Sequence, residues 1–469
     1  MSRIKRFIQT ALTYLAGNIF SKLVTFFLIP LYTNRLTTAE YGDYDVTVTV
    51  VTLLVSVAFF QIWDGMFRMS FDFEETEDKY AVISVCFKGY LLEIAAFTIL
   101  YFILARVLNF QMLFLPYLFG ISFGLQYMYS FATRIFLNNK LFVISGSVNT
   151  FTIAVVNIVL IVFFHMGVQS LYLAQIAGAL IQILIIEANL HLIPNMLGKR
   201  FDLEIIRRVL RFSVPLCIAT ISYWLLSGFT KITINQVCGA EDNGLFAVAS
   251  SLSNMAVIAV NVFQFAWNET AYLMANEDNR AGIYKKSLDL LFCTVWICCA
   301  GLCTLISLIY PFYIGDAFQS SSVIVPYLMI GVSANAIAGF LGTLFMTEKK
   351  TTSIMTSTFI AAAVNLSFSV FAARKFGLDG AVLVLTASFV LLMVLRLSQI
   401  RKELKITVSK QSLLSLIPVL ISVFLFRHEA GIVVNIVYIL VLIVIYFLLF
   451  QKLTGIRLRN IWQSKAAGR

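Results

Sequence analysis

The chain has 469 residues, of which 60% are hydrophobic and only 13% are charged, and its mean hydropathy is +0.88. About a quarter of the residues in soluble globular domains are charged, so this composition excludes a soluble protein and predicts a polytopic membrane protein. The net charge of +11 does not indicate nucleic-acid binding, because the basic residues concentrate in alternate loops, the distribution that sets membrane topology and attracts lipid headgroups.

The first apolar segment begins near residue 10 and extends to Pro30 without a small-residue cleavage site, so we expect a retained helix and not a signal peptide. With most Lys and Arg residues inside, both termini are expected in the cytoplasm. A membrane crossing needs about 20 residues, and the sequence predicts an all-α protein with about fourteen transmembrane helices. The later helices begin near residues 42, 82, 112, 142, 168, 209, 244, 285, 322, 352, 377, 411 and 430.

A weak internal repeat relates the first six predicted helices to the next six. Pro116-Tyr117-Leu118 recurs as Pro326-Tyr327-Leu328, and Gly167 recurs as Gly377, each about 210 residues later. Because six is even, both halves have the same orientation in the membrane, as parallel repeats do. Two such halves usually rock around a site at their interface, which is the architecture of secondary transporters.

The repeat predicts two pseudo-symmetric six-helix lobes and an appended helix pair. The first lobe covers residues 1–195, and residues 196–405 hold the inter-lobe linker and the second lobe. Residues 406–469 hold the last two helices and a cytoplasmic tail; this pair either packs on one lobe or binds a lipid tail. Gly42 and Gly244 mark the start of the second helix of each lobe.

Polar residues recur at helical spacing on the first two helices of each lobe. An unpartnered polar group is costly in hydrocarbon, so such stripes indicate either a helix contact or a water-filled cavity. We favour a central hydrophilic cavity, with simple packing as the alternative. The stripes contain Asn18 and Lys22; Asp45, Thr49, Thr52 and Ser56; Thr220, Tyr223, Ser227 and Lys231; and Ser250, Asn254, Asn261, Gln264 and Asn268.

Two lysines lie inside predicted spans. Lys22 is near the bilayer centre, where an ionised lysine costs about 2.5 to 3.5 kcal/mol. We expect it to bind an anionic ligand in a wet lumen, with a structural salt bridge as the alternative. Lys231 is a second candidate, although it lies nearer the outer end of its helix, where its ammonium group can reach the interface.

Arg68 closes the second helix at its predicted cytoplasmic end, four residues after Asp64. One possibility is that the two residues form an internal ion pair. The alternative is that Arg68 binds a diphosphate at the inner entrance, while Asp64 holds the Arg68 side chain in place until the ligand arrives. Arg134, near the inner end of the fourth helix, adds to this positive entrance or serves topology alone.

Three further acids, Glu93, Glu269 and Asp289, lie at or within spans and are candidates for ion coupling. The cysteines and the three histidines form no paired metal-ligand spacing. No metal site, catalytic residue or cofactor is therefore predicted.

The segment Phe27-Leu28-Ile29-Pro30-Leu31-Tyr32-Thr33, followed by Ala39-Glu40-Tyr41-Gly42-Asp43-Tyr44 and by Gly65 and Arg68, resembles the opening of the bacterial polysaccharide-biosynthesis flippases. These O-antigen-type (Wzx-like) proteins belong to the multidrug/oligosaccharidyl-lipid/polysaccharide exporter superfamily. The resemblance implies two six-helix lobes with two extra helices. The second lobe does not repeat Gly65 and Arg68, because the corresponding residues are Asn268-Glu269-Thr270. We therefore do not expect the two lobes to bind a phosphate group symmetrically.

The resemblance also implies a substrate and a location. Family members move undecaprenyl-diphosphate-linked oligosaccharide units from the inner to the outer leaflet of the bacterial cytoplasmic membrane by alternating access. The implied partners are this lipid, membrane lipids, a polysaccharide polymerase and glycosyltransferases. Exporting about two negative charges across 100 mV gains roughly 4 to 5 kcal/mol, so the membrane potential could drive transport; proton or cation counter-transport is left open.

Two other functions are compatible with a chain of this kind. A cation-coupled multidrug exporter of the same superfamily is disfavoured by Lys22 and Lys231, which oppose a cationic ligand. A membrane-embedded polymerase or ligase would be an enzyme with the same lipid substrate. The longest predicted outer loops, around Val237 to Asn243 and Tyr310 to Ser322, are short and contain no His or Arg, which favours a transporter.

Overall fold

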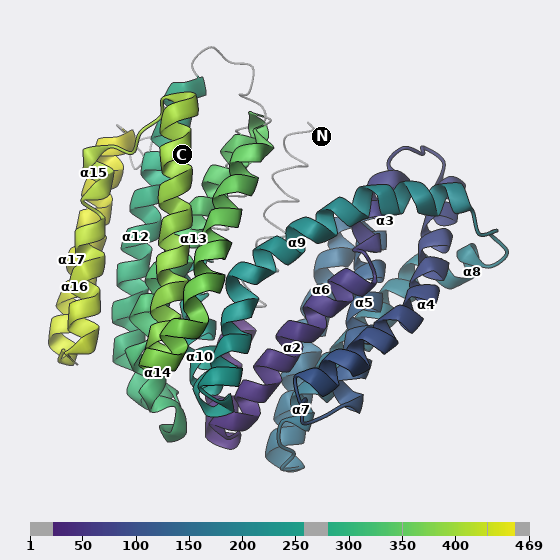
Figure 1. Ribbon diagram of the computed structural model, residues 1–469, viewed down its shortest axis with the longest axis horizontal. Helices are drawn as coiled ribbons and strands as arrows, with labels where there is room; N and C mark the ends of the chain where they lie inside the picture. The colour runs from purple at the N-terminus through teal and green to yellow at the C-terminus, as the bar shows by residue number, and fades with distance from the viewer. Residues whose placement is uncertain (1–21, 258–279, 349, 429, 455–469) are drawn as a thin grey trace, which may run out of the picture. The chain divides into compact units, whose positions relative to one another are not determined.

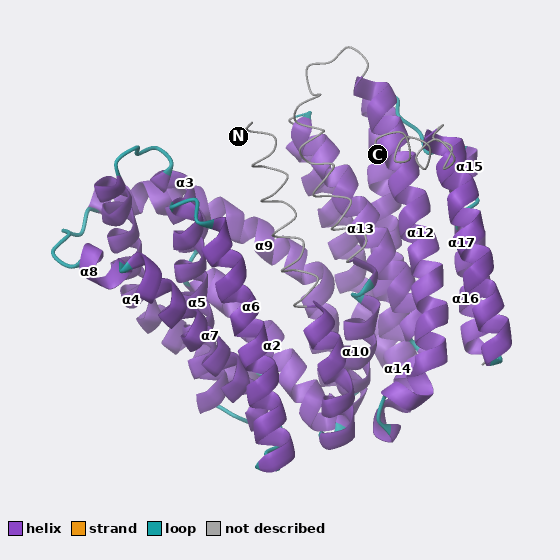
Figure 2. Ribbon diagram, turned by 180° about the vertical axis from the view of Figure 1, so that it is seen from behind, coloured by secondary structure: helices purple, strands orange, loops and turns teal. Residues whose placement is uncertain are grey.

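The structure is a computed structural model that describes residues 22–257, 280–348, 350–428 and 430–454. Within these ranges the chain is helical apart from short connections and contains no strand (Figure 2). Nine of the described helices are long and apolar enough to cross a membrane. The prediction of an all-α polytopic membrane protein is therefore confirmed. Four of the predicted site residues, Asn18, Asn261, Gln264 and Glu269, lie outside the described residues.

The chain forms two compact units, Met1–Gly244 and Leu245–Arg469. The first unit extends beyond the lobe boundary near residue 195 that the repeat indicates, because α9 packs along α2 and α3. Residues 22–35 are helical. The other helices of this unit are α2 (Thr38–Ala58), α3 (Ile62–Ser70), α4 (Thr76–Val107), α5 (Phe114–Ile135), α6 (Asn139–Ile158) with the π-helix η1 (Val159–Phe163), α7 (Gln169–Leu190), α8 (Leu192–Met196) and α9 (Leu203–Val237). The next helix, α10 (Ala240–Ser253), begins in the first unit and continues into the second.

Local signals define both ends of α2. Thr37 and Glu40 form a capping box at its start, in which each side chain accepts a hydrogen bond from the other residue's backbone N–H. At the other end, Phe60 and Gln61 both have positive φ values, 45° and 49°, which stop the helix and restart it as α3. The second predicted span is therefore a long helix followed by a separate short one.

Gly42 and Gly244 lie in one close contact between the starts of α2 and α10. A Cβ atom on Gly42 would lie 1.9 Å from the carbonyl oxygen of Ala240, and one on Gly244 would lie 1.9 Å from that of Thr38. No side chain fits at either position, so only glycine allows this approach. The contact is reciprocal. Gly42 faces Ala240, one helical turn before Gly244, and Gly244 faces Thr38, one helical turn before Gly42.

Stacked aromatic rings form much of the core of the first unit. Phe59, at the end of α2, lies 4.3 Å from Tyr90 and 5.4 Å from Phe97 between ring centroids. All three side chains are almost completely buried. Such rings bury a large apolar area, and their stacking adds about 0.5 to 1.5 kcal/mol per pair. This core fixes α2 against α4 and so positions the polar face of α2.

The second unit contains the remaining helices (Figure 1). Its longest helix includes the eleventh and twelfth predicted spans, which Gly377 separates with φ 62° and ψ −147°, a conformation that favours glycine. The described elements after α10 are α12 (Arg280–Tyr313), the 3-10 helix η2 (Asp316–Val323), α13 (Val325–Thr347), α14 (Thr351–Leu404), α15 (Lys410–Leu413), α16 (Leu416–Arg427) and α17 (Ile432–Thr454).

The appended pair, α16 and α17, packs on α12 (Figure 1). Asp289 of α12 fixes its start: Oδ1 accepts hydrogen bonds from the Ser409 backbone N–H at 2.7 Å and from Ser412 Oγ at 2.9 Å. Asp289 is only 5% exposed. Its contacts are those of a structural anchor, which supports the packing alternative for the helix pair and leaves ion coupling by Asp289 as a prediction.

Candidate functional site

Lys231 of α9 forms an ion pair with Asp45 of α2. Its Nζ donates to Asp45 Oδ1 at 2.8 Å and to Thr49 Oγ1 at 3.3 Å. The side chains of Lys231 and Asp45 are 23% and 21% exposed, and Asp45 Oδ2 is buried without a hydrogen-bond partner among the described residues. Lys231 was predicted to bind substrate; here its charge is balanced by Asp45, a partner that the sequence analysis did not assign to it.

Further polar contacts join α9 to α2 and to Gln61, the N-cap of α3. The hydroxyls of the α2 stripe also bond to carbonyls of their own helix, for example Thr49 Oγ1 to the Asp45 carbonyl at 2.7 Å. The two stripes thus meet each other, as the packing alternative predicts, and the central cavity stays a prediction. The cross-helix contacts are Asn235 Nδ2 to Asp43 Oδ1 at 3.2 Å, Trp224 Nε1 to the Thr49 carbonyl at 3.3 Å, and Gln61 Nε2 to Thr220 Oγ1 at 2.7 Å.

Arg68 pairs with Asp72 and not with Asp64. Its Nη1 donates to Asp72 Oδ1 at 2.7 Å, and both side chains are about half exposed, at 52% and 51%. Asp64, in the first turn of α3, instead interacts electrostatically with Arg134 of α5. Exposed ion pairs contribute only about 0 to 1 kcal/mol, so an anionic ligand could displace Asp72 from Arg68 at little cost.

Asp64 and Arg134 form a second charged group beside Arg68. Burial raises the pKa of the Asp64 carboxyl, and Arg134 together with the Trp63 indole opposes that rise. The guanidinium carbon of Arg134 lies 4.6 Å from the ring centroid of Phe67 and 5.1 Å from that of Phe131. Aromatic faces attract a cation without neutralising it. The end of α3 and the end of α5 therefore carry two arginines close to one another in the fold.

Lys22 is exposed and has no ion pair or hydrogen bond to any described residue. It lies at the beginning of the helical residues 22–35 in the first unit. Asn254, another predicted ligand, is also exposed and lies in the second unit, at the turn that follows α10. An exposed ammonium group in a segment of this hydropathy fits a water-filled environment better than a lipid-facing one.

Glu93 lies in α4 of the first unit, within a candidate span. Its Oε2 is buried and has no hydrogen-bond partner among the described residues. Ionisable residues within membrane spans are rare and often functional, so ion coupling by Glu93 stays a prediction.

Arg396 of α14 is a buried cation that was not among the predicted site residues. It is 7% exposed, and its guanidinium donates to Ser357 Oγ at 3.2 Å, to Thr358 Oγ1 at 3.0 Å and to the carbonyl of Ala338. Gly342 leaves the space for it, because a Cβ there would lie 3.0 Å from Arg396 Nη1. The only signal in the sequence is an arginine inside the twelfth predicted span. These contacts tie both parts of α14 to α13.

Comparison with known proteins identifies the family. The profile described as "Polysaccharide biosynthesis protein" matches residues 7–267, more than half of the chain. The chain belongs to this family. No curated protein sequence matches it.

Solved structures similar to this member of the polysaccharide biosynthesis family are transporters. The lipid II flippase MurJ in an inward closed conformation matches with a TM-score of 0.69 and 16% identity, over 93% of this chain and 97% of that one. An inward-facing multidrug resistance MATE transporter of the MOP superfamily gives 0.55 and 11%, over 90% and 96%. A Vibrio cholerae MATE transporter gives 0.54 and 13%, over 85% and 97%.

These likenesses extend over nearly the whole chain and establish the fold as that of MOP superfamily transporters. The predicted family and fold class are confirmed, and the prediction of a transporter instead of an enzyme agrees with every structure named above. At these identities the likeness concerns the fold alone, and the substrate has to be argued from this chain's own residues.

Proposed function

We propose that this chain is a flippase that moves undecaprenyl-diphosphate-linked oligosaccharide units from the inner to the outer leaflet of the bacterial cytoplasmic membrane for cell-surface polysaccharide synthesis. It works by alternating access, with both termini in the cytoplasm. The observation that carries the proposal is membership of the polysaccharide biosynthesis family on a fold similar to that of the lipid II flippase MurJ.

The charged residues of the first unit support an anionic lipid substrate. Lys22 has no anionic partner among the described residues, whereas Lys231 is balanced by Asp45. Lys22 is therefore the in-span cation that remains available for a diphosphate. Arg68 joins it as an exposed group whose weak pair with Asp72 can be exchanged for phosphate oxygens.

Two energy sources fit the proposal. Outward movement of about two negative charges is favoured by roughly 4 to 5 kcal/mol at 100 mV, so the membrane potential can drive export. Glu93, with its unpartnered carboxylate oxygen, is the residue of the described chain best placed to carry a proton in a counter-transport cycle. Partner glycosyltransferases and a polymerase would supply and consume the lipid-linked unit.

The proposal is tested by complementation of a strain that lacks the gene. Wild type and the Lys22→Ala variant are compared for surface polysaccharide and for the sidedness of the lipid-linked unit. We expect the variant to reach the membrane at the wild-type level and to leave the unit in the inner leaflet. Arg68→Ala should lower export to a lesser degree, and Lys22→Arg, which keeps the positive charge, should restore it.

Different outcomes separate the functions. Inner-leaflet accumulation in both the deletion and the Lys22→Ala strain supports the flippase. Full polymer production by Lys22→Ala would remove Lys22 from the substrate site. Outer-leaflet units that never polymerise would instead indicate the polymerase or ligase, and drug sensitivity with normal polysaccharide would indicate the multidrug exporter.

A further inference from the structure

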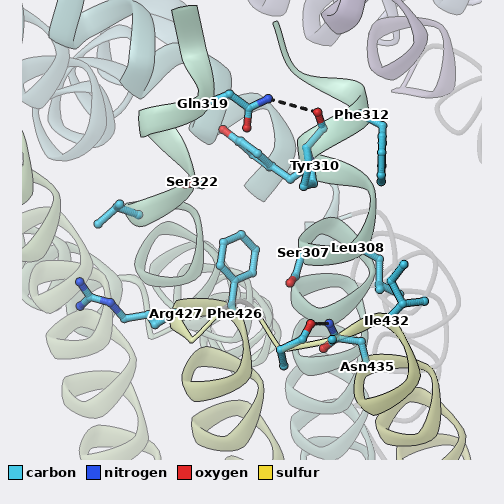
Figure 3. A pocket seen from close by; sticks show the side chains of 14 residues that line it. Ser307, Leu308, Tyr310, Phe312, Gln319, Ser322, Phe426, Arg427, Ile432 and Asn435 are labelled. Carbon is cyan, nitrogen blue, oxygen red and sulfur yellow. Dashed lines mark hydrogen bonds between the residues drawn. The ribbon is translucent and has the colours of Figure 1, made fainter. Parts of the chain in front are cut away.

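A cavity of about 610 Å³ lies in the second unit between the end of α12, η2, the end of α16 and the start of α17 (Figure 3). Consecutive spans run in opposite directions, so these helix ends share one face of the membrane, the outer face in the predicted topology. Phe426 and Ser307 point into the space below η2 (Figure 3). The residues that carry its chemistry are Ser307, Gln319, Ser322, Phe426, Arg427 and Asn435.

The internal repeat shows how this corner differs from its counterpart in the first unit. In the first unit, Thr98 Oγ1 and Tyr117 OH are hydrogen bonded at 2.9 Å. The repeat relates Tyr117 to Tyr327 and, within one residue, Thr98 to Ser307. Tyr327 OH instead accepts a hydrogen bond from Arg427 of the appended pair. Ser307 therefore lacks the tyrosine partner that its counterpart has, and it lines the cavity.

Aromatic rings occupy the corresponding corner of the first unit. Phe102 lies 5.6 Å from Tyr117 between ring centroids, and Tyr101 lies 6.2 Å from Phe110. In the second unit the repeat relates Phe102 to Phe312, 210 residues later, which lines the cavity. Phe312 is 88% exposed, whereas Phe102 is 45% exposed. The ring at this position is therefore turned toward the surface, and the corner holds a cavity with an arginine at its side.

The polar groups of the cavity suit an anion that also carries hydroxyl groups. Arg427 is the only charged side chain among the described residues that line it, and it has no ion pair with any described residue; Glu429 lies outside them. Asn435 is 1% exposed; its Nδ2 donates to the Ala430 carbonyl at 2.8 Å, while its Oδ1 has no partner in the described chain. An arginine binds phosphate strongly, and an unpaired amide oxygen accepts from a hydroxyl.

The rim of the cavity is apolar and lipid-accessible. Phe312 is 88% exposed and Ile432 61%. Exposed apolar side chains at the ends of transmembrane helices contact acyl chains and not water. A ligand with its phosphate beside Arg427 would therefore place an apolar portion along α17, which favours a lipid over a free phosphate ester.

We propose that this cavity binds the headgroup of an anionic glycerophospholipid, with its phosphate at Arg427 and its hydroxyl groups toward Ser307 and Asn435. The site is separate from the proposed transport site and belongs to the second unit alone. It would fix a lipid of the outer leaflet between α12 and the appended pair.

Native mass spectrometry of the full-length protein in detergent tests the proposal, with phosphatidylglycerol as the probe. We expect wild type to retain phosphatidylglycerol, and Arg427→Gln to lower its affinity at least about tenfold, the effect of losing a charged hydrogen bond. Phosphatidylcholine, which has no headgroup hydroxyl and no net charge, should bind no better to wild type than to the variant.

Two matched variants separate lipid binding from a structural role of Arg427. Tyr327→Phe removes the hydrogen bond to Arg427 but keeps the guanidinium, so lipid binding should survive. Arg106→Gln removes an exposed arginine at the end of α4 and should leave binding unchanged. Equal loss in Arg427→Gln and Arg106→Gln, or loss in Tyr327→Phe, would overturn the proposal. Competition by glycerol phosphate at equal concentration would overturn the lipid and leave a soluble phosphate ester as the ligand.

Discussion

At the scale of single residues, the pair between Asp45 and Lys231 shows how a charge can be retained inside an apolar protein. Each side chain is about four-fifths buried, and each would be costly without the other, because removing one partner leaves an uncompensated charge. Lys22 differs, since it is exposed and unpaired within the described chain. Similar lysines in the sequence therefore have different surroundings in the fold.

This difference predicts that substitutions at the two lysines affect the free energy of unfolding unequally. Asp45→Leu and Lys231→Leu should each destabilise the protein by about 1 to 3 kcal/mol, seen as a lower melting temperature in detergent. The double variant should recover most of the loss, because no unpaired charge remains. Lys22→Ala is the control and should leave the melting temperature unchanged. If the loss of stability in the double variant equals the sum of the two single losses, Asp45 and Lys231 are not energetically coupled.

At the scale of helices, glycines determine how closely elements approach. A Cβ on Gly42 would overlap the carbonyl of Ala240, whereas one on Gly146 of α6 would have its nearest neighbour 4.0 Å away. The same substitution should therefore have opposite consequences at the two positions.

We expect Gly42→Ala to destabilise the protein by about 1 to 3 kcal/mol, since α2 and α10 must separate. Gly146→Ala should be neutral or stabilising by about 0.5 to 1 kcal/mol, because alanine is favoured over glycine inside a helix. Thermal unfolding of both variants measures the difference. A loss in Gly146→Ala as large as that in Gly42→Ala would contradict the close-contact argument.

The anchor of the appended helices gives a second prediction at this scale. Asp289→Leu leaves the Ser409 N–H without its acceptor and removes the shorter hydrogen bond of the Ser412 hydroxyl, at a cost of about 1 to 3 kcal/mol for the buried donor left unpaired. The segment before α15 should open and become sensitive to trypsin at Lys405 or Lys410. Asp316→Leu, at an exposed acid of η2, is the control. Unchanged cleavage in Asp289→Leu would exclude the anchoring role.

The sequence was informative about helices and less so about contacts. The predicted spans beginning near 112, 142 and 168 agree with α5, α6 and α7 within a few residues, because bilayer thickness sets the length of an apolar segment. The break at Gln61 could not be predicted, because no glycine or proline marks it in the sequence. The pair of Arg68 with Asp72 has the local i, i+4 spacing, but Asp64 lies four residues to the other side and has the same spacing, so the sequence did not decide between them. Arg396 was missed because its partners come from α13 and a distant part of α14.

At the scale of the whole molecule, the distribution of charge predicts the topology. Asn109 follows α4 in a predicted outer loop, and Arg200 lies in the basic segment between α8 and α9, which is predicted to be cytoplasmic. In a variant whose half-buried Cys238 is replaced by serine, Asn109→Cys should react with a membrane-impermeant maleimide in intact cells. Arg200→Cys should react only after the cells are opened. The reverse pattern would invert the orientation.

The reciprocal contact of Gly42 and Gly244 has a consequence for the origin of the chain. In an isologous interface between two identical subunits, residue i of one subunit contacts residue j of the other, and residue j of the first contacts residue i of the second. The two glycine contacts follow this pattern. Here the equivalent residues, Thr38 with Ala240 and Gly42 with Gly244, belong to one polypeptide. The ancestor of this protein would then have been a six-helix chain that paired with a second copy of itself through this glycine, before gene fusion made the pairing permanent and allowed each half to diverge.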